Sequence, residues 1–159
     1  MSDFPIIIRS YVSDDLHYIA DSWSKTLHLA MPFCYIPRDL YFNRQLQLIR
    51  SIIAHPSVLT LVACLAEDPS IIIGYLVYEF VGASSQLKTL VVHWAETKSA
   101  FRRQHVLTTL LNAVEPLWRK KLIIITQPSK VFTLMRRQFY LQYDPFLLSN
   151  FYQGKTNEA

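Results

Sequence analysis

The residues of this sequence that could do chemistry are a strongly basic segment and a histidine just before it. Between positions 98 and 137 the sequence has nine Lys and Arg residues and one acidic residue, Glu115. The nine are Lys98, Arg102, Arg103, Arg119, Lys120, Lys121, Lys130, Arg136 and Arg137. Clustered like charges repel each other unless they are screened or paired. The segment therefore predicts an anionic partner, such as nucleic acid or an acidic protein, with a solvated basic face as the alternative. His93 is a candidate acid–base group because the ordinary pKa of histidine is close to neutrality.

The two cysteines do not indicate metal chemistry. Cys34 and Cys64 lie in Phe- and Leu-rich surroundings, with no His or Cys at ligand spacing. Buried free thiols are therefore favoured over a disulfide or a metal site. No metal site is predicted elsewhere in the chain.

Size and composition predict one compact domain with a substantial apolar core. The chain has 159 residues, of which 51% are hydrophobic and 18% charged. We expect a single domain over residues 1–154 and a flexible tail over 155–159. No window approaches the roughly 20 apolar residues that cross a bilayer, and no signal peptide is evident. The expectation is a soluble, cytoplasmic protein, and its high apolar fraction leaves room for a homodimer interface.

Hydrophobic periodicity and turn residues predict seven strands and four helices. Strands are expected near residues 6–11, 58–66, 71–81, 87–97, 121–126, 139–143 and 146–152, and helices near 13–29, 38–55, 106–118 and 128–138. Ser13, followed by two acids, is a good helix start. The apolar strand 121–126 fits a central position covered on both faces. The predicted order is β-α-α-β-β-β-α-β-α-β-β, an α/β (α+β) arrangement.

One stretch of this pattern resembles a known cofactor-binding motif. Residues 97–111 read TKSAFRRQHVLTTLL. They resemble the acetyl-CoA-binding segment of the Gcn5-related N-acetyltransferase (GNAT) superfamily, in which Arg or Gln follows a strand end by five positions. Arg102 stands at that place, while His105 and Leu107 stand where the family prefers Gly and Gly or Ala. The residues Ile6-Ile7-Ile8-Arg9 and Asp14-Asp15-Leu16 are similar to the family's opening strand and helix.

The resemblance implies a fold and a cofactor. The fold would be a mixed, twisted sheet in which strands 87–97 and 121–126 splay apart around the pantetheine arm. The turn into the next helix would hold the cofactor diphosphate, because the first amides of a helix are unpaired and lie at its positive end. The implied cofactor is acetyl-CoA or another acyl-CoA. The residues implied to bind it are Ala95, Thr97, Arg102, Arg103, Gln104, His105, Val106 and Leu107.

The resemblance also implies candidates for proton transfer. The family's base is commonly a Glu on or near the fourth strand, which makes Glu96 the natural candidate. His93 is the second, and strand alternation places it on the opposite face of the sheet from Glu96. A structural role is the alternative for each. The family's acid is usually a Tyr of the fourth helix. That helix has no Tyr here, so Tyr140, just after it, is the candidate acid.

Three hypotheses about function follow. The leading one is an acyl-CoA-dependent N-acyltransferase acting on an unidentified amine. The aromatic residues Trp23, Phe33, Tyr35, Tyr41 and Phe42 would then shape the acceptor pocket or, alternatively, pack in the core. The second is a protein of the same fold without catalysis that binds nucleic acid or an acidic partner through residues 98–137. The third is a structural subunit.

Overall fold

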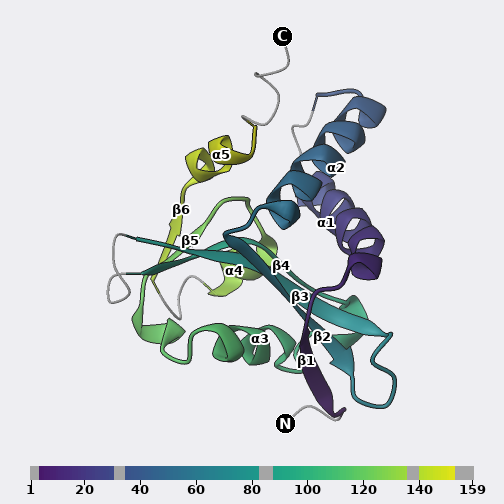
Figure 1. Cartoon of the computed structure of the whole chain (residues 1–159), viewed down its shortest axis with the longest axis vertical. Coiled ribbons are helices and arrows are strands. Elements are labelled where there is room, and N and C mark those ends of the chain that lie inside the picture. The colour runs from purple at the N-terminus through teal and green to yellow at the C-terminus, as the bar shows by residue number, and fades with distance from the viewer. Residues whose placement is uncertain (1–3, 31–34, 83–87, 136–139, 153–159) are drawn as a thin grey trace.

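The computed structural model of the protein describes residues 4–30, 35–82, 88–135 and 140–152. A six-stranded mixed sheet forms its framework, in the order β1-β2-β3-β4-β5-β6 (Figure 1). The strands are β1 (Ile6–Ser10), β2 (Val58–Leu65), β3 (Ile72–Val81), β4 (Thr89–Thr97), β5 (Ile123–Ile125) and β6 (Leu141–Tyr143). β1 to β4 pair antiparallel, and β5 and β6 are added in parallel.

Helices cover both faces of the sheet (Figure 1). They are α1 (Leu16–Ala30), α2 (Arg38–Ala54), α3 (Val106–Val114), α4 (Lys130–Met135) and α5 (Ser149–Tyr152). Short 3-10 turns lie at Ser13–Asp15, Ser99–Phe101, Trp118–Lys120 and Pro145–Leu148. Side chains of α1, α2 and α5 pack on one face, and those of α3 and α4 pack on the other. The molecule is therefore a three-layer α/β structure.

Each face of the sheet has its own apolar core. On the α1 face, Trp23 and Ile49 pack against Tyr75 and Trp94. On the α3 face the largest fully buried side chains include Trp118 and Phe132, and the helix contributes Leu110 and Leu111. The strands between them are buried on both sides, which explains their nearly continuous apolar sequences.

The predicted α/β fold with a mixed central sheet is confirmed, but the end of the chain differs from the prediction. Six strands are present in the described residues instead of about seven. The last predicted strand, residues 146–152, is a 3-10 turn followed by α5. The Asp144 side chain accepts a hydrogen bond from Phe146 N at 3.0 Å, and Pro145 opens the turn. A side-chain cap followed by proline is a helix start, and the apolar run after it concealed that signal.

Several predictions fall partly or wholly outside the described residues. These are the tail 155–159, Phe33, Cys34, Arg136, Arg137 and the end of the predicted fourth helix. Cys64 is buried and free, as predicted. In the described ranges, no helix combines the length and the apolarity needed to cross a membrane. No group of His, Cys, Asp or Glu suited to a metal ion is found in that part of the chain either.

Candidate functional site

The connection from β4 to α3 presents a row of unpaired backbone amides. Among the described residues, no partner is found for the N–H groups of residues 103–108, and the first helical bond runs from Thr109 N to His105 O at 2.9 Å. No side chain caps this end of α3. The free amides lie at the positive end of a helix of nine residues, an arrangement that suits a phosphate or diphosphate.

The two residues that depart from the family pattern have different surroundings. Leu107 is half-buried and packs against the core cluster on the α3 face. The side chain of His105 is exposed. His105 adopts a left-handed backbone conformation, with φ 61° and ψ 18°, which explains why glycine suits this position. The turn therefore keeps the geometry that a glycine would give, at a cost in backbone strain.

Substitution at His105 tests that strain. His105→Gly is expected to have a free energy of unfolding about 1 kcal/mol higher than His105→Ala, because both lose the imidazole but only glycine is relaxed at positive φ. Urea denaturation of the two variants measures the difference. Equal stabilities would contradict the left-handed conformation of this residue.

A glycine of β3 allows α3 to begin close to the end of β4. A Cβ added at Gly74 would lie 2.8 Å from both the Glu96 backbone oxygen and Val106 Cγ1. Lys98 N donates to Ile73 O at 2.8 Å and ties the chain to β3 as it leaves β4. Gly74 therefore positions the first turn of α3 against the strand end.

β4 continues beyond the point where β5 leaves it. The two strands pair from Leu90 with Ile123 to Val92 with Ile125, and Thr126 N adds one bond to Val92 O at 3.2 Å. β4 then runs on to Thr97. From residue 93 onward, the edge of β4 that faces β5 has no neighbouring strand among the described residues. The pairing of the two strands therefore ends before the end of β4. Of the candidate cofactor residues on this part of β4, Ala95 is buried in the core on the α3 face and Thr97 is partly exposed.

Three hydrogen bonds fix the Glu96 carboxylate. Its Oε1 accepts from Thr26 Oγ1 at 2.8 Å, and its Oε2 accepts from Trp94 Nε1 at 3.0 Å and from the Tyr75 hydroxyl at 3.2 Å. Burial, together with the charge of Glu96, raises the pKa of Tyr75 well above its ordinary value. Tyr75 therefore remains a donor. The three donors hold the Glu96 carboxylate in one orientation beneath α1.

His93 lies in a bulge of β4, and this corrects its predicted placement. The register with β3 passes from Trp94 opposite Val77 to Val92 opposite Tyr78, which leaves His93 as the extra residue. His93 and Glu96 consequently lie on the same face of the sheet, the one covered by α1 and α5. The ring centres of His93 and Phe151 of α5 are 5.1 Å apart, and Glu96 accepts a hydrogen bond from Thr26 of α1. Strand alternation had predicted opposite faces. A bulge inserts one residue and breaks that alternation.

The surroundings of His93 are polar although it is 1% exposed. Nε2 lies 3.1 Å from Glu79 Oε1, and Nδ1 lies 3.0 Å from Thr126 Oγ1. Burial opposes the ionisation of Glu79, but the hydrogen bonds from His93 and Ser57 outweigh it and lower the pKa of Glu79. Sequence reasoning missed Glu79. A carboxylate within an otherwise apolar strand was the available signal, since a buried charge requires a partner.

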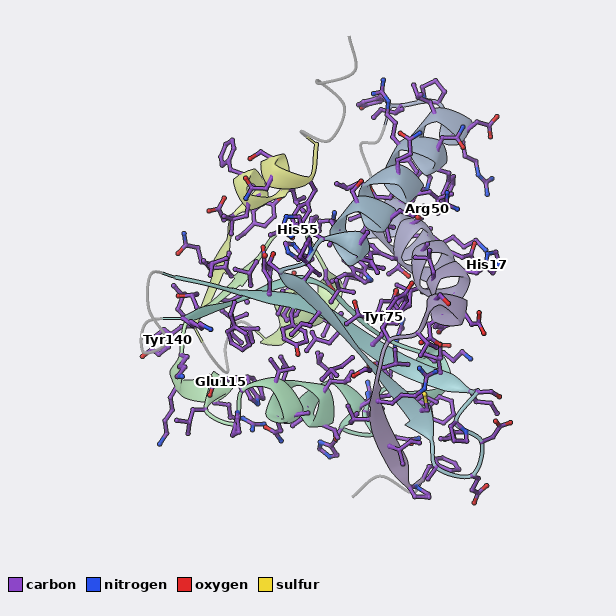
Figure 2. All side chains as sticks on the ribbon, viewed as in Figure 1. His17, Arg50, His55, Tyr75, Glu115 and Tyr140 are labelled. Atoms are coloured by element: carbon purple, nitrogen blue, oxygen red, sulfur yellow. The ribbon has the colours of Figure 1, made fainter. Side chains whose placement is uncertain are left out.

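Tyr140, the candidate acid, is not brought to these residues. It precedes β6 and is 71% exposed. Its carbonyl accepts from Ile123 N at 2.9 Å, and Ile123 pairs with Leu90 near the beginning of β4. Figure 2 shows Tyr140 well separated from Tyr75, which bonds to Glu96.

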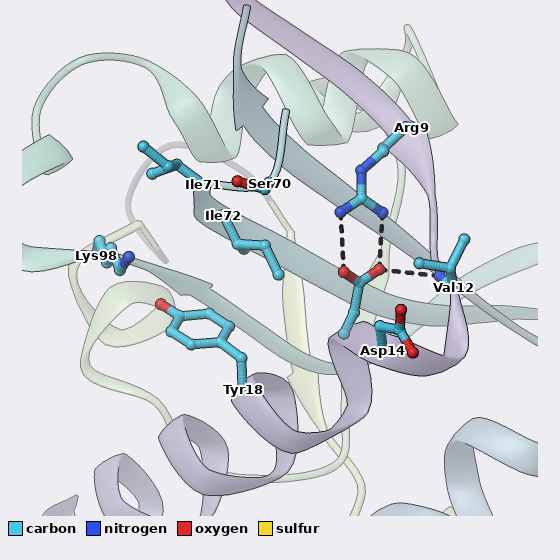
Figure 3. Close-up of a pocket in the computed structure, with 9 residues that line it drawn as sticks. Arg9, Val12, Asp14, Tyr18, Ser70, Ile71, Ile72 and Lys98 are labelled. Carbon is cyan, nitrogen blue, oxygen red and sulfur yellow. Dashed lines mark hydrogen bonds and ion pairs between the residues drawn. The ribbon is translucent and has the colours of Figure 1, made fainter. Parts of the chain in front are cut away.

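A pocket of about 480 Å³ lies beside the end of β4, between the β1–α1 connection and the β2–β3 turn (Figure 3). On one side, Arg9 forms a two-bond ion pair with Asp15, at 2.7 and 2.9 Å, which lowers the pKa of that carboxyl. On another side, Lys98 Nζ lies 5.1 Å from the ring centre of Tyr18. Burial and the charge of Glu96 raise the pKa of Tyr18 to about 12. The pocket thus offers a neutral hydroxyl beside a cation.

Comparison with known proteins gives matches among solved structures. No family model matches the chain, and no curated protein matches it. A ribosomal-protein-alanine N-acetyltransferase of Brucella melitensis biovar Abortus 2308 aligns with a TM-score of 0.56 at 12% identity, over 85% of this chain and 87% of that chain. A protein of Pyrococcus furiosus assigned as an acetyl transferase aligns with a TM-score of 0.54 at 13% identity, over 98% and 95% of the two chains.

A third match is more similar in sequence but covers less of this chain. It is a Staphylococcus aureus protein assigned to the GNAT family of acetyltransferases, with a TM-score of 0.52 at 19% identity, over 69% of this chain and 88% of that chain. Identities this low show a shared fold, and function has to be argued from the site. The predicted resemblance is confirmed at that level: the protein has the fold of the Gcn5-related N-acetyltransferases, with a divergent sequence.

Proposed function

We propose that the protein is an acyl-CoA-dependent N-acyltransferase that acts on an amine. The observation that carries the proposal is the row of free amides of residues 103–108, which directly follows the strand that parts from β5. Structural neighbours named as acetyltransferases support it. The side chains at positions 105 and 107 are compatible with a diphosphate, because one is exposed and the other packs into the core.

The chain's own residues have distinct parts in this proposal. The amides of residues 103–108 and the exposed guanidinium groups of Arg102 and Arg103 would hold the diphosphate of acetyl-CoA, with Ala95 and Thr97 along the pantetheine arm. When bound, the cofactor supplies the thioester whose acyl group moves to the amine. Glu96 attracts the ammonium form of the acceptor to the site. His93 accepts its proton through the Thr126 hydroxyl, which lies 3.0 Å from His93 Nδ1.

Thermal unfolding with acetyl-CoA tests the proposal. A ligand at 100 times its dissociation constant adds about 2.7 kcal/mol to stability, which for a chain of this size raises Tm by roughly 5–10 °C. Pantetheine, which lacks the diphosphate, is expected to give a much smaller shift at equal concentration. No shift at millimolar acetyl-CoA would contradict the proposal.

A charge-matched pair of variants localises the binding. Arg102→Glu is expected to weaken acetyl-CoA binding about tenfold or more, since a hydrogen bond to a charged group contributes about 1.5–3 kcal/mol. Arg119→Glu makes the same charge change at an exposed position whose guanidinium lies over the ring of Trp118, 4.4 Å from its centre, at the other end of α3. Its affinity for acetyl-CoA should stay close to that of the unchanged protein.

A second candidate function is favoured by the exposure of the basic segment. All its described cations are exposed: Lys98, Arg102, Arg103, Arg119, Lys120, Lys121 and Lys130. Such a surface suits nucleic acid or an acidic protein. Binding through phosphates weakens steeply with salt. Retention of duplex DNA that does not fall between low and moderate salt would exclude this candidate.

A further inference from the structure

Five polar side chains form a continuous hydrogen-bonded chain across the sheet. The contacts run from His55 Nδ1 to Ser57 Oγ at 2.8 Å, from Ser57 Oγ to Glu79 Oε2 at 2.8 Å, from Glu79 Oε1 to His93 Nε2 at 3.1 Å, and from His93 Nδ1 to Thr126 Oγ1 at 3.0 Å. Every link is of hydrogen-bond length. The residues come from the α2–β2 connection, β3, β4 and the end of β5, so this chain exists only in the folded protein.

The two ends of this hydrogen-bonded chain of side chains lie in different environments. Thr126 and His93 are each 1% exposed, and they lie where β4 and β5 part. His55 and Ser57 are exposed at the other end, just after α2, where Figure 2 shows His55. The hydrogen-bonded chain therefore connects buried residues, at the point where the pairing of β4 with β5 ends, with solvent.

The groups along the hydrogen-bonded chain would allow Glu79 to be protonated transiently. Glu79 is 7% exposed, and along the path it has one histidine on each side, His93 in direct contact and His55 beyond Ser57. Among the described residues, the groups that face His93 are Glu79 of β3, Thr126 after β5 and the apolar ring of Phe151 on α5. His55 faces Ser57 and the same Phe151 ring. Glu79 is thus the sole charged group of this set, and it can be neutralised by a proton from either histidine.

We propose that this chain is a proton relay that removes the proton released by the acceptor amine, an inference that rests on the proposed acyl transfer. The ammonium gives one proton to the Thr126 hydroxyl as that hydroxyl gives its own to His93 Nδ1. His93 Nε2 then passes a proton to Glu79. The Ser57 hydroxyl, which donates to Glu79 Oε2 at rest, turns toward His55 Nδ1, takes the proton of Glu79 and gives its own to His55. His55 Nε2 then releases one proton to water. One proton leaves the amine and one reaches solvent, so after each hydroxyl and ring has reset no residue has changed its charge.

The relay has a consequence that does not require a substrate. Protonation of His55 should change the NMR signals of the His93 ring, because Glu79 links the two histidines. In an NMR titration of histidine-labelled protein, the His93 ring signals are expected to shift over the pH range in which His55 titrates. Glu79→Gln should abolish that response, because an amide cannot carry the proton across. Independent titrations in the unchanged protein would overturn the relay, whether or not acetyl-CoA binds.

Kinetics then test its part in the reaction. The probe is thiol release from acetyl-CoA with a panel of primary amines. Near neutral pH, Glu79→Gln is expected to lower kcat on the order of 100-fold, the usual contribution of proton transfer, with an unchanged KM for acetyl-CoA. Well above the pKa of the amine, the variant should approach the kcat of the unchanged protein, because the amine then enters in its neutral form and its remaining proton is taken up by the leaving thiolate. A uniform loss at every pH would indicate a structural role and contradict the relay.

Variants at the exposed end of the hydrogen-bonded chain keep the relay testable even if Glu79→Gln does not fold. His55→Gln should reduce kcat with the same dependence on pH, and added imidazole should restore it. His17→Gln is the matched control, because His17 is an exposed histidine on α1 outside the chain. If acetyl-CoA binds and amines react but His55→Gln behaves as His17→Gln does, the relay is wrong and the proposed function stands. If acetyl-CoA does not bind, or if no amine of the panel reacts, the proposed function fails, and with it the relay's role.

Discussion

Trp23→Ala is expected to lower the free energy of unfolding by about 4 kcal/mol, the middle of the range for a buried tryptophan. Trp23 is fully buried and stacks on Trp94, with ring centres 5.7 Å apart and planes 8° apart. Its Nε1 donates to Gln127 Oε1 at 2.7 Å. The substitution removes this packing between α1 and the sheet, and it leaves a buried amide oxygen without its donor.

Two further variants separate these contributions in urea denaturation. Trp23→Phe keeps an aromatic ring and removes the donor, so its loss should be about 1–3 kcal/mol. Leu29→Ala on the same helix changes a side chain that is 80% exposed, and it should be nearly neutral. A loss below about 1 kcal/mol for Trp23→Ala would contradict the stacked arrangement.

Gly74→Val is expected to damage the proposed cofactor site more than the fold. The new side chain would meet the Glu96 backbone oxygen and Val106, both 2.8 Å from the added Cβ. Overpacking of this kind costs about 1–3 kcal/mol of stability. The first turn of α3 has to move away from β4, so at least one amide contact with the diphosphate is lost. Acetyl-CoA binding should weaken about tenfold or more.

A double-mutant cycle checks the cause. Val106→Ala removes one of the two obstructing groups, so Gly74→Ala combined with Val106→Ala should be less destabilised than the sum of the two single variants. The backbone oxygen of Glu96 remains, which limits the recovery. Strictly additive losses, with acetyl-CoA affinity unchanged, would show that Gly74 does not position α3.

Local features of the sequence were sufficient for most of the fold. Alternation and helical periodicity depend on residues within one or two turns of each other. For that reason the elements from β1 to β5 were predicted within a few residues of their observed ends. The turn from β4 into α3 was implied by the resemblance of residues 97–111 to a family motif, which also lies within one short segment.

Tertiary structure decided which side chains meet. Glu79 and His93 are 14 positions apart and Trp23 and Gln127 are 104 apart, and nothing in the local pattern of either segment specifies its partner. The face on which His93 lies depends on a bulge in the pairing of β3 with β4, and the helical end of the chain depends on a cap that an apolar run concealed. The sequence by itself determined the order of the elements from β1 to β6. Only packing between strands and layers determined the surroundings of Glu96 and His93. Strand register and side-chain pairing depend on which distant segments pack together in the folded protein, and a local sequence pattern does not specify this.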